Sequence, residues 1–197
     1  MTKVLVTGFG PFGFHQANPT GDVLPLLKPR GINLATATLP VAFQDSSKML
    51  QGLLEQHTPD LTIALGLTGM EGAIKIERVA INVDDARIPD NLGQQPVDQP
   101  TIEGGPVGYW SSLPLRKIGA LMDRKGVKAQ ISETAGTYVC NHVFYHLCHL
   151  RETRYPQMTA GFIHIPPLAS LGFSLDELAR LLEEVLACCL DSSATQP

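Results

Sequence analysis

The sequence places one of its cysteines, Cys140, at the predicted start of a helix. Residues 127–131 alternate like a short strand, residues 135–137 are small and suit a tight turn, and apolar residues recur at helical spacing from 143 to 150. The first N–H groups of a helix are unpaired and its dipole is positive there, so this position can activate a thiol and hold an oxyanion. A cysteine can also be a small buried hydrophobe, and position alone does not choose between the two.

His164 is the second residue whose type and place could serve catalysis. It lies near the end of an apolar strand predicted over residues 160–167, and we expect it at the same edge of the sheet as Cys140. A histidine there could take the proton of a thiol as a general base. A lone histidine between isoleucines can equally be an ordinary core residue, so this hypothesis depends on its partners.

Glu77 is the candidate third member of a catalytic group. Apolar residues occupy even positions from Ile74 and odd positions from Val79, so the alternation slips at residues 77–78, as a β-bulge would make it do. In the second register the carboxylate shares a face with buried β-branched residues and needs a partner. Either Glu77 forms a structural ion pair, with Arg78 or Arg87, or it orients a catalytic histidine.

Residues 8–13 match the glycine pattern G-x-G-x-x-G directly after a buried strand, which is the dinucleotide fingerprint. Pro11 and two phenylalanines crowd this loop, and the following strand ends without the acidic residue that binds a ribose. A nicotinamide-dependent oxidoreductase built on residues 8–13 is therefore one alternative function, which a cofactor titration would test. Otherwise Phe9 and Phe12 either wall a small-ligand site at the sheet edge or belong to the core.

Three histidines, His142, His146 and His149, are spaced so that a helix would align them on one stripe. Two such residues and an acid can bind zinc. The neighbouring stripe that contains Val143 and Leu147 predicts the core face, which would leave the histidines half exposed beside it. No H-E-x-x-H pattern is present, so we predict no metal site.

The elements that must position these residues alternate between strand and helix along the chain. This order predicts an α/β fold with a largely parallel, mixed central sheet between helical layers. Residues 84–111 show no clear element, and a loop this long is expected to be a lid, a binding loop or an oligomer contact. Strands are predicted over residues 3–7, 34–41, 61–65, 74–83, 127–131 and 160–167, and helices over 19–28, 44–56, 113–125, from 140, and over 174–190.

Composition predicts one compact domain over residues 1–197. Hydrophobic residues make up 44% and charged residues 17% of the 197 residues, which suits a sizeable core. The formal charge of −4 and the scattered basic residues argue against a nucleic-acid partner. The sequence contains no apolar run of about 18 residues, so we expect no membrane span. The sequence shows no signal-peptide pattern, and its four cysteines show no Cys-x-x-Cys spacing. We therefore expect a cytoplasmic protein with reduced thiols.

Several motifs in this order resemble the pyroglutamyl peptidase I (pyrrolidone-carboxylate peptidase) family of cysteine peptidases over residues 4–167. The most specific are residues 77–82 (Glu-Arg-Val-Ala-Ile-Asn) and 86–91 (Ala-Arg-Ile-Pro-Asp-Asn). The others are residues 7–9 (Thr-Gly-Phe), 11–13 (Pro-Phe-Gly), 18–19 (Asn-Pro), 95–96 (Gln-Pro), 104–106 (Gly-Gly-Pro), 109–110 (Tyr-Trp), 134–142 (Thr-Ala-Gly-Thr-Tyr-Val-Cys-Asn-His) and 161–166 (Gly-Phe-Ile-His-Ile-Pro).

The resemblance implies what the residue patterns leave open. It implies a peptidase that releases N-terminal pyroglutamate from peptides and proteins through an acyl-enzyme, without a cofactor, on a three-layer α/β/α sandwich assembled as a dimer or tetramer. A non-catalytic binder of pyroglutamyl peptides is the other alternative, although all three triad candidates are present. The implied residues are Cys140, His164 and Glu77 as the triad, Arg87 at the oxyanion site, and Phe9, Phe12 and Val139 as walls of the pyroglutamyl pocket, with Ile88 as a further apolar candidate.

Three departures from the family pattern put the shape of the substrate pocket in question. Gly10 stands where the family usually has an acidic residue, and Phe14 replaces a second glycine. Residues 67–71 (Leu-Thr-Gly-Met-Glu) replace a segment that usually contains Ala-Gly-Gly. All three triad candidates are nevertheless in place.

Overall fold

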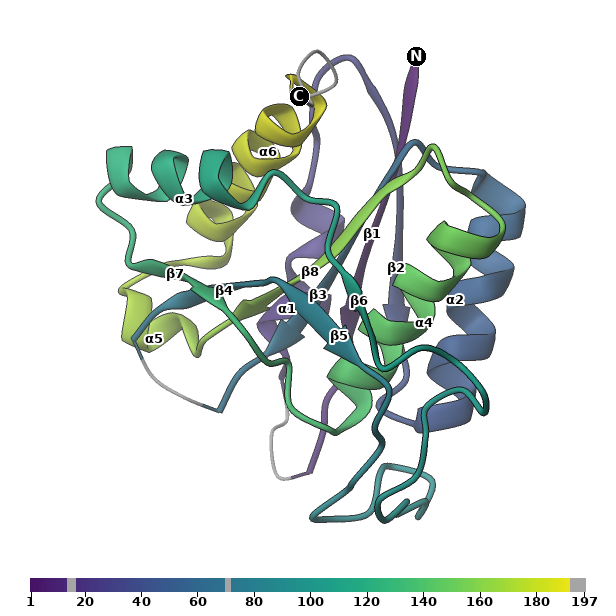
Figure 1. Ribbon diagram of the computed structural model, residues 1–197. Coiled ribbons are helices and arrows are strands. Elements are labelled where there is room, and N and C mark those ends of the chain that lie inside the picture. Colours follow the sequence, from purple (N-terminus) through teal and green to yellow (C-terminus); the bar gives the residue numbers. More distant parts are fainter. Residues whose placement is uncertain (14–16, 70–71, 192–197) are drawn as a thin grey trace.

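The computed structural model describes residues 1–13, 17–69 and 72–191 (Figure 1). Within these ranges a six-stranded sheet has the order β2-β1-β3-β8-β4-β7. All neighbouring strands run parallel except β4 and β8, so β4 and β7 run against the other four. The strands are β1 (Thr2–Phe9), β2 (Ile32–Leu39), β3 (Leu61–Leu67), β4 (Ile74–Glu77), β7 (Ala129–Ser132) and β8 (Thr159–Ile165).

Helices cover both faces of this sheet, which confirms the predicted α/β/α layers (Figure 1). One face carries α2 (Phe43–His57) and α4 (Val139–Thr153). The other face carries the 3-10 helix η1 (Leu24–Leu26), α3 (Leu115–Arg124) and α6 (Leu175–Leu190). The short helices α1 (Pro19–Asp22) and α5 (Leu168–Leu171) follow β1 and β8. No helix in the described ranges combines the length and the apolar character needed to cross a membrane.

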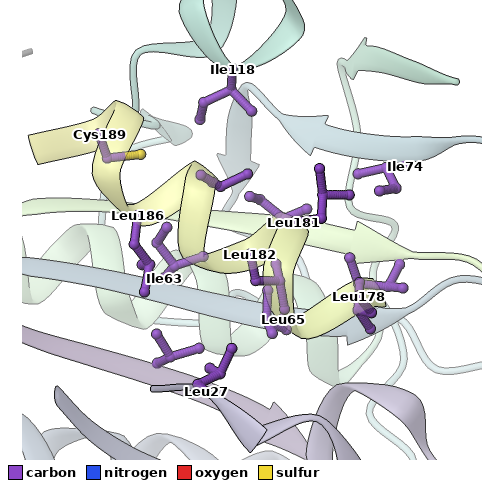
Figure 2. Close-up of a cluster of buried hydrophobic side chains, with 14 of the residues drawn as sticks. Leu27, Ile63, Leu65, Ile74, Ile118, Leu178, Leu181, Leu182, Leu186 and Cys189 are labelled. Carbon is purple, nitrogen blue, oxygen red and sulfur yellow. The ribbon is translucent and has the colours of Figure 1, made fainter. Parts of the chain in front are cut away.

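An apolar core fills each of the two interfaces between the sheet and its helices. Figure 2 shows the first, where Leu186 of α6 lies beside Ile63 of β3 and Leu182 lies beside Leu65. The second lies under α2 and α4, and includes Phe144 and Phe162. Burial of this apolar surface is the main favourable contribution to folding, and it holds α4, the helix that begins at Val139, tightly against the sheet.

Local signals set several helix ends as predicted, with one correction. Asn18 caps α1 by accepting from the backbone N–H of Thr20, and Ser174 and Glu177 form a capping box at the start of α6. The helix predicted over residues 19–28 ends at Asp22, however. Pro25 has no N–H to donate to an α-helix, so the chain continues as the 3-10 helix η1.

Residues 74–83 form two strands, so the prediction of one bulged strand is wrong. Strand β4 ends at Glu77, and β5 (Val79–Ile81) pairs with β6 (Gly108–Trp110) in a separate two-stranded sheet. Between them the N–H of Arg78 donates to the carbonyl of Ser132 at 2.9 Å. The slipped alternation therefore marks the point at which the chain leaves the main sheet. Strand β6 also shows that the segment predicted to lack any element contains one.

Candidate active site

The antiparallel pairing of β4 with β8 brings Glu77 and His164 together. His164 lies directly opposite Lys75, so Glu77, two residues further on, is its diagonal neighbour on the same face. The imidazole Nδ1 is 2.7 Å from Glu77 Oε1, and since a carboxylate can only accept, Nδ1–H donates. His164 is 6% exposed and Glu77 is fully buried, so each ionised side chain needs the other.

Cys140 lies beside this pair on α4, a helix that packs on one face of the sheet. It is the second residue of α4, as the sequence predicts, and is only partly buried. Its Sγ lies over Gly66 of β3, where an added Cβ would stand 3.0 Å from the sulfur and 2.7 Å from the ring of Phe162. The missing side chain of Gly66 thus allows the thiol to approach the sheet.

The charge balance of His164 reflects both neighbours. Burial lowers its pKa, but Cys140, through its charge and a hydrogen bond, and Glu77, through the same two effects, raise it to about 9. Because Nδ1 is bonded to Glu77, the remaining nitrogen, Nε2, is available to the thiol. The arrangement can therefore move a proton from sulfur to an imidazole held in one tautomer.

The start of α4 offers a binding place for an anion. Tyr138 is the N-cap residue, and its side chain makes no capping hydrogen bond. No side-chain cap therefore covers the N–H groups of the first turn, which leaves them available to an anion.

A search for relatives finds that the model of the pyroglutamyl peptidase family matches residues 2–177. This chain belongs to that family. The pyrrolidone-carboxylate peptidase of Streptomyces coelicolor is 46% identical over 169 residues, which are 84% of this chain and 78% of that protein. The one from Bacillus licheniformis is 40% identical over 187 residues, 93% of this chain and 87% of that protein.

Solved structures of family members agree with the fold as well. Pyroglutamyl peptidase I of Bacillus amyloliquefaciens is 37% identical, with a TM-score of 0.90, and the match covers 97% of this chain and 98% of that one. A mutant pyrrolidone carboxyl peptidase from Pyrococcus furiosus is 36% identical, with a TM-score of 0.91, over 98% of this chain and 100% of that one. The overall fold of this chain is thus that of solved pyroglutamyl peptidase structures.

The other residues predicted for this pyroglutamyl peptidase site lie at different depths. Phe9 and Val139 are 3% and 1% exposed and belong to the core under α4. Phe12 is half-buried on the loop after β1, whereas Ile88 is 52% exposed. Arg87 is exposed and has no hydrogen-bond or ion-pair partner within residues 1–13, 17–69 and 72–191. The structure thus does not join Arg87 to the triad candidates.

Tyr138 is a residue of this site that sequence reasoning missed. Its ring centroid lies 5.4 Å from that of Phe12 and 5.4 Å from that of Phe43, and its hydroxyl donates to the carbonyl of Pro89 at 3.0 Å. Burial first, then the charges of Asp90 and Cys140, raise the pKa of Tyr138 to about 12, so it stays a donor. An aromatic residue two positions before the candidate nucleophile was the available signal.

The loop of residues 8–13 does not offer a phosphate cradle. The N–H of Phe9 donates to Thr20 Oγ1 at 3.0 Å, and the N–H of Gly10 donates to the carbonyl of Leu39 at 3.1 Å. A Cβ on Gly8 would stand 1.9 Å from the carbonyl oxygen of Thr20, so this glycine serves close packing of α1. Backbone N–H groups that a pyrophosphate would need are already used, which counts against the oxidoreductase alternative.

The histidine stripe of α4 corrects one expectation. His142 is buried, not half exposed, and its Nδ1 is 2.7 Å from Asp84 Oδ2. His149 Nδ1 pairs with the hydroxyl of Tyr109 at 2.8 Å. In the part of the chain that the structure describes, no group of three or more His, Cys, Asp or Glu side chains could hold a metal ion. Of the family departures, Phe14, Met70 and Glu71 lie outside the described residues.

Proposed function

We propose that this protein removes N-terminal pyroglutamate from peptides and proteins as a cysteine peptidase with a Cys140–His164–Glu77 triad. The observation that carries the proposal is the convergence of Cys140 Sγ on the buried His164–Glu77 pair, from a helix start. Membership of the pyroglutamyl peptidase family, whose relatives carry that activity in their names, supports the choice of substrate.

The reaction follows from this geometry in two halves. His164 Nε2 accepts the proton of Cys140 Sγ, and the thiolate attacks the carbonyl carbon between pyroglutamate and the next residue. First-turn N–H groups of α4 stabilise the oxyanion. The imidazolium gives its proton to the departing amine, the C–N bond breaks, and a thioester remains. Water, deprotonated by His164, then attacks the thioester, and pyroglutamate and the thiol are released.

Glu77 keeps the imidazole in one orientation and balances its positive charge in both halves of the reaction. The family resemblance implies Arg87 at the oxyanion site; since its side chain is exposed and not joined to the triad candidates, we propose that it contacts the oxyanion only once the peptide is bound. No cofactor takes part in these steps. Assembly into a dimer or tetramer is a separate prediction, which light scattering of the purified protein would test.

We propose that an apolar pocket selects the substrate by enclosing the uncharged lactam ring of its N-terminal pyroglutamate. Phe9, Phe12, Val139 and Ile88 are the proposed walls, and none of them can pair with a charge. Ring-opened glutamate would bring a carboxylate and an ammonium, whose burial without partners is costly. Hydrogen bonds to the lactam N–H and C=O would discriminate against proline by about 10⁴-fold or more, since their loss leaves buried polar atoms unpaired.

The deciding experiment measures kcat/KM for matched pyroglutamyl, prolyl and glutamyl arylamides, with and without iodoacetamide. We expect hydrolysis of the pyroglutamyl substrate alone, lost after alkylation. Equal rates on the prolyl substrate would contradict lactam recognition. Full activity after Cys140 is alkylated would contradict the thiol mechanism, and tight nicotinamide binding would revive the oxidoreductase alternative.

A further inference from the structure

Asn141, the residue after Cys140, is fully buried and uses its whole side-chain amide on one backbone segment. Its Oδ1 accepts the N–H of Ile81 at 3.1 Å, and its Nδ2 donates to the carbonyl oxygens of Ile81 at 2.8 Å and Val83 at 3.1 Å. An asparagine side chain has two N–H donors, so both are used. The opposite amide orientation would set oxygen against two carbonyls, so these contacts define the orientation.

The segment that Asn141 holds is the edge of β5 that faces away from β6. In an antiparallel pair, successive residues direct their backbone groups alternately toward and away from the partner strand. The N–H of Asn82 donates to the carbonyl of Val107, on the β6 side, so the N–H and C=O of Ile81 point the other way. Asn141 bonds to both of these groups, as a residue of a neighbouring strand would.

This contact joins α4, which carries Cys140, to the strand that follows Glu77 in the chain. Cys140 directly precedes Asn141 on α4, and β5 begins two residues after Glu77. We propose that Asn141 is a positioning residue, which holds the start of α4, and with it Cys140 Sγ and the first-turn N–H groups, in register with the His164–Glu77 pair. The proposal rests on the proposed function, because it assigns Asn141 a task in that same site.

The alternative is that Asn141 only satisfies buried backbone groups. Asn82 serves as a control that separates a positioning role from a purely structural one, because its amide makes the same set of hydrogen bonds away from the triad. Its Oδ1 accepts the N–H of Ile102 at 2.9 Å, and its Nδ2 donates to the carbonyls of Ile102 at 2.9 Å and Gly105 at 3.2 Å. Asn82 holds a loop turn that carries no triad residue.

The test compares Asn141→Leu with Asn82→Leu, since each change removes three side-chain hydrogen bonds at nearly constant volume. For each variant we would measure kcat and KM on a pyroglutamyl arylamide, the rate of Cys140 alkylation by limiting iodoacetamide, and Tm. Asn141→Leu should lower kcat by about 10- to 100-fold with little change in KM, because displacement of a reacting group by about 1 Å costs that much. It should also slow alkylation of Cys140. Asn82→Leu should lower Tm and leave kcat within about threefold.

Asn141→Asp gives a second measure that a purely structural role would not move. A protonated carboxyl can donate to the carbonyl of Ile81 and accept its N–H, whereas an ionised one cannot donate. Because burial favours the neutral acid, the ratio of kcat for this variant to that of the wild type should rise as pH falls from about 8 to about 5.5. The same ratio for Asn141→Leu should stay flat.

Three outcomes would overturn the proposal. In the first, both Asn141 variants keep kcat within about threefold of the wild type. In the second, Asn82→Leu loses as much kcat as Asn141→Leu. In the third, neither Asn141 variant folds, which assigns the amide to stability alone. If the wild type fails to cleave the pyroglutamyl substrate, the proposed function is wrong, yet the alkylation rate of Cys140 still tests Asn141.

Discussion

Two buried histidine–carboxylate pairs of this protein have the same geometry and different surroundings. His164 Nδ1 lies 2.7 Å from Glu77, and His142 Nδ1 lies 2.7 Å from Asp84. All four residues are at most 6% exposed. The first pair has the thiol of Cys140 on its other side. The second has no thiol, and its Nε2 has no hydrogen-bond partner among the described residues.

The difference teaches that a histidine–carboxylate pair is not by itself a catalytic site. Asp84 also accepts a hydrogen bond from the hydroxyl of Thr101 at 2.8 Å, so the His142 pair ties the long loop to α4. Beside it, burial first, then the charges of His142 and His149, lower the pKa of His146 to about 3, so His146 itself is uncharged at neutral pH. Among the histidines that the structure describes, His164 alone meets both a thiol and a carboxylate.

Loss of the thiol should have the largest effect. We expect Cys140→Ala to lower kcat by about 10⁴-fold or more, as removal of a nucleophile does in comparable triads. Burial raises the pKa of Cys148 and of Cys189 to about 12, and raises that of Cys188, so these thiols are poor nucleophiles.

Alanine variants of Cys148, Cys188 and Cys189 serve as controls and should keep their activity. Mass spectrometry after limiting iodoacetamide should find Cys140 modified first. Preferential labelling of another cysteine, with activity retained, would show that Cys140 is not the nucleophile, and the two histidine–carboxylate pairs would then no longer differ by a reactive thiol.

Changes in the first pair should follow. His164→Ala should cost more kcat than Glu77→Gln, because an orienting residue usually contributes less than the base itself. Both are measured as kcat on the pyroglutamyl arylamide, with circular dichroism to confirm the fold. If Glu77→Gln kept full activity, the two pairs would differ only in position, and Glu77 would be a structural partner.

A pH profile should then distinguish the pairs. Since the pKa of His164 is raised to about 9, its imidazolium persists above neutral pH and is lost as pH rises through that value. We expect kcat/KM to fall about tenfold for each pH unit above it. Glu77 contributes to this raised pKa, so Glu77→Gln should move the alkaline limb to lower pH, whereas Asp84→Asn should leave it in place. If the alkaline limb moved equally in both variants, it could not be assigned to the His164–Glu77 pair.

The smallest effect on activity is expected in the second pair. Asp84→Asn and His142→Gln should leave kcat within about tenfold of the wild type, because neither side chain meets the thiol. Each change leaves a buried partner uncompensated, which should cost about 3–5 kcal/mol of unfolding free energy if the pair is ionised. Urea unfolding measures this cost. A large loss of kcat without loss of stability would show that the second pair serves catalysis too.

Local patterns were enough to predict most of the elements and the place of Cys140 at a helix start. The helix that starts at Val139 and the capped helix that starts at Leu175 depend on residues within one or two turns, so periodicity and caps reveal them. The predictions of secondary structure failed where an element depends on contacts with residues far away in the sequence. The bulge predicted at residues 77–78 is a change of sheet, because β6, a strand about 30 residues away, pairs with β5.

By itself, the sequence determined the alternation of strands and helices, the place of Cys140 at a helix start, and the family motifs. Only the tertiary structure decided which histidine meets which carboxylate. Glu77 and His164 are 87 residues apart, and Asp84 and His142 are 58 apart. Glu77 reaches His164 because β4 runs against β8 with Lys75 opposite His164, and neither the direction nor the register of such a pair is written in the local pattern.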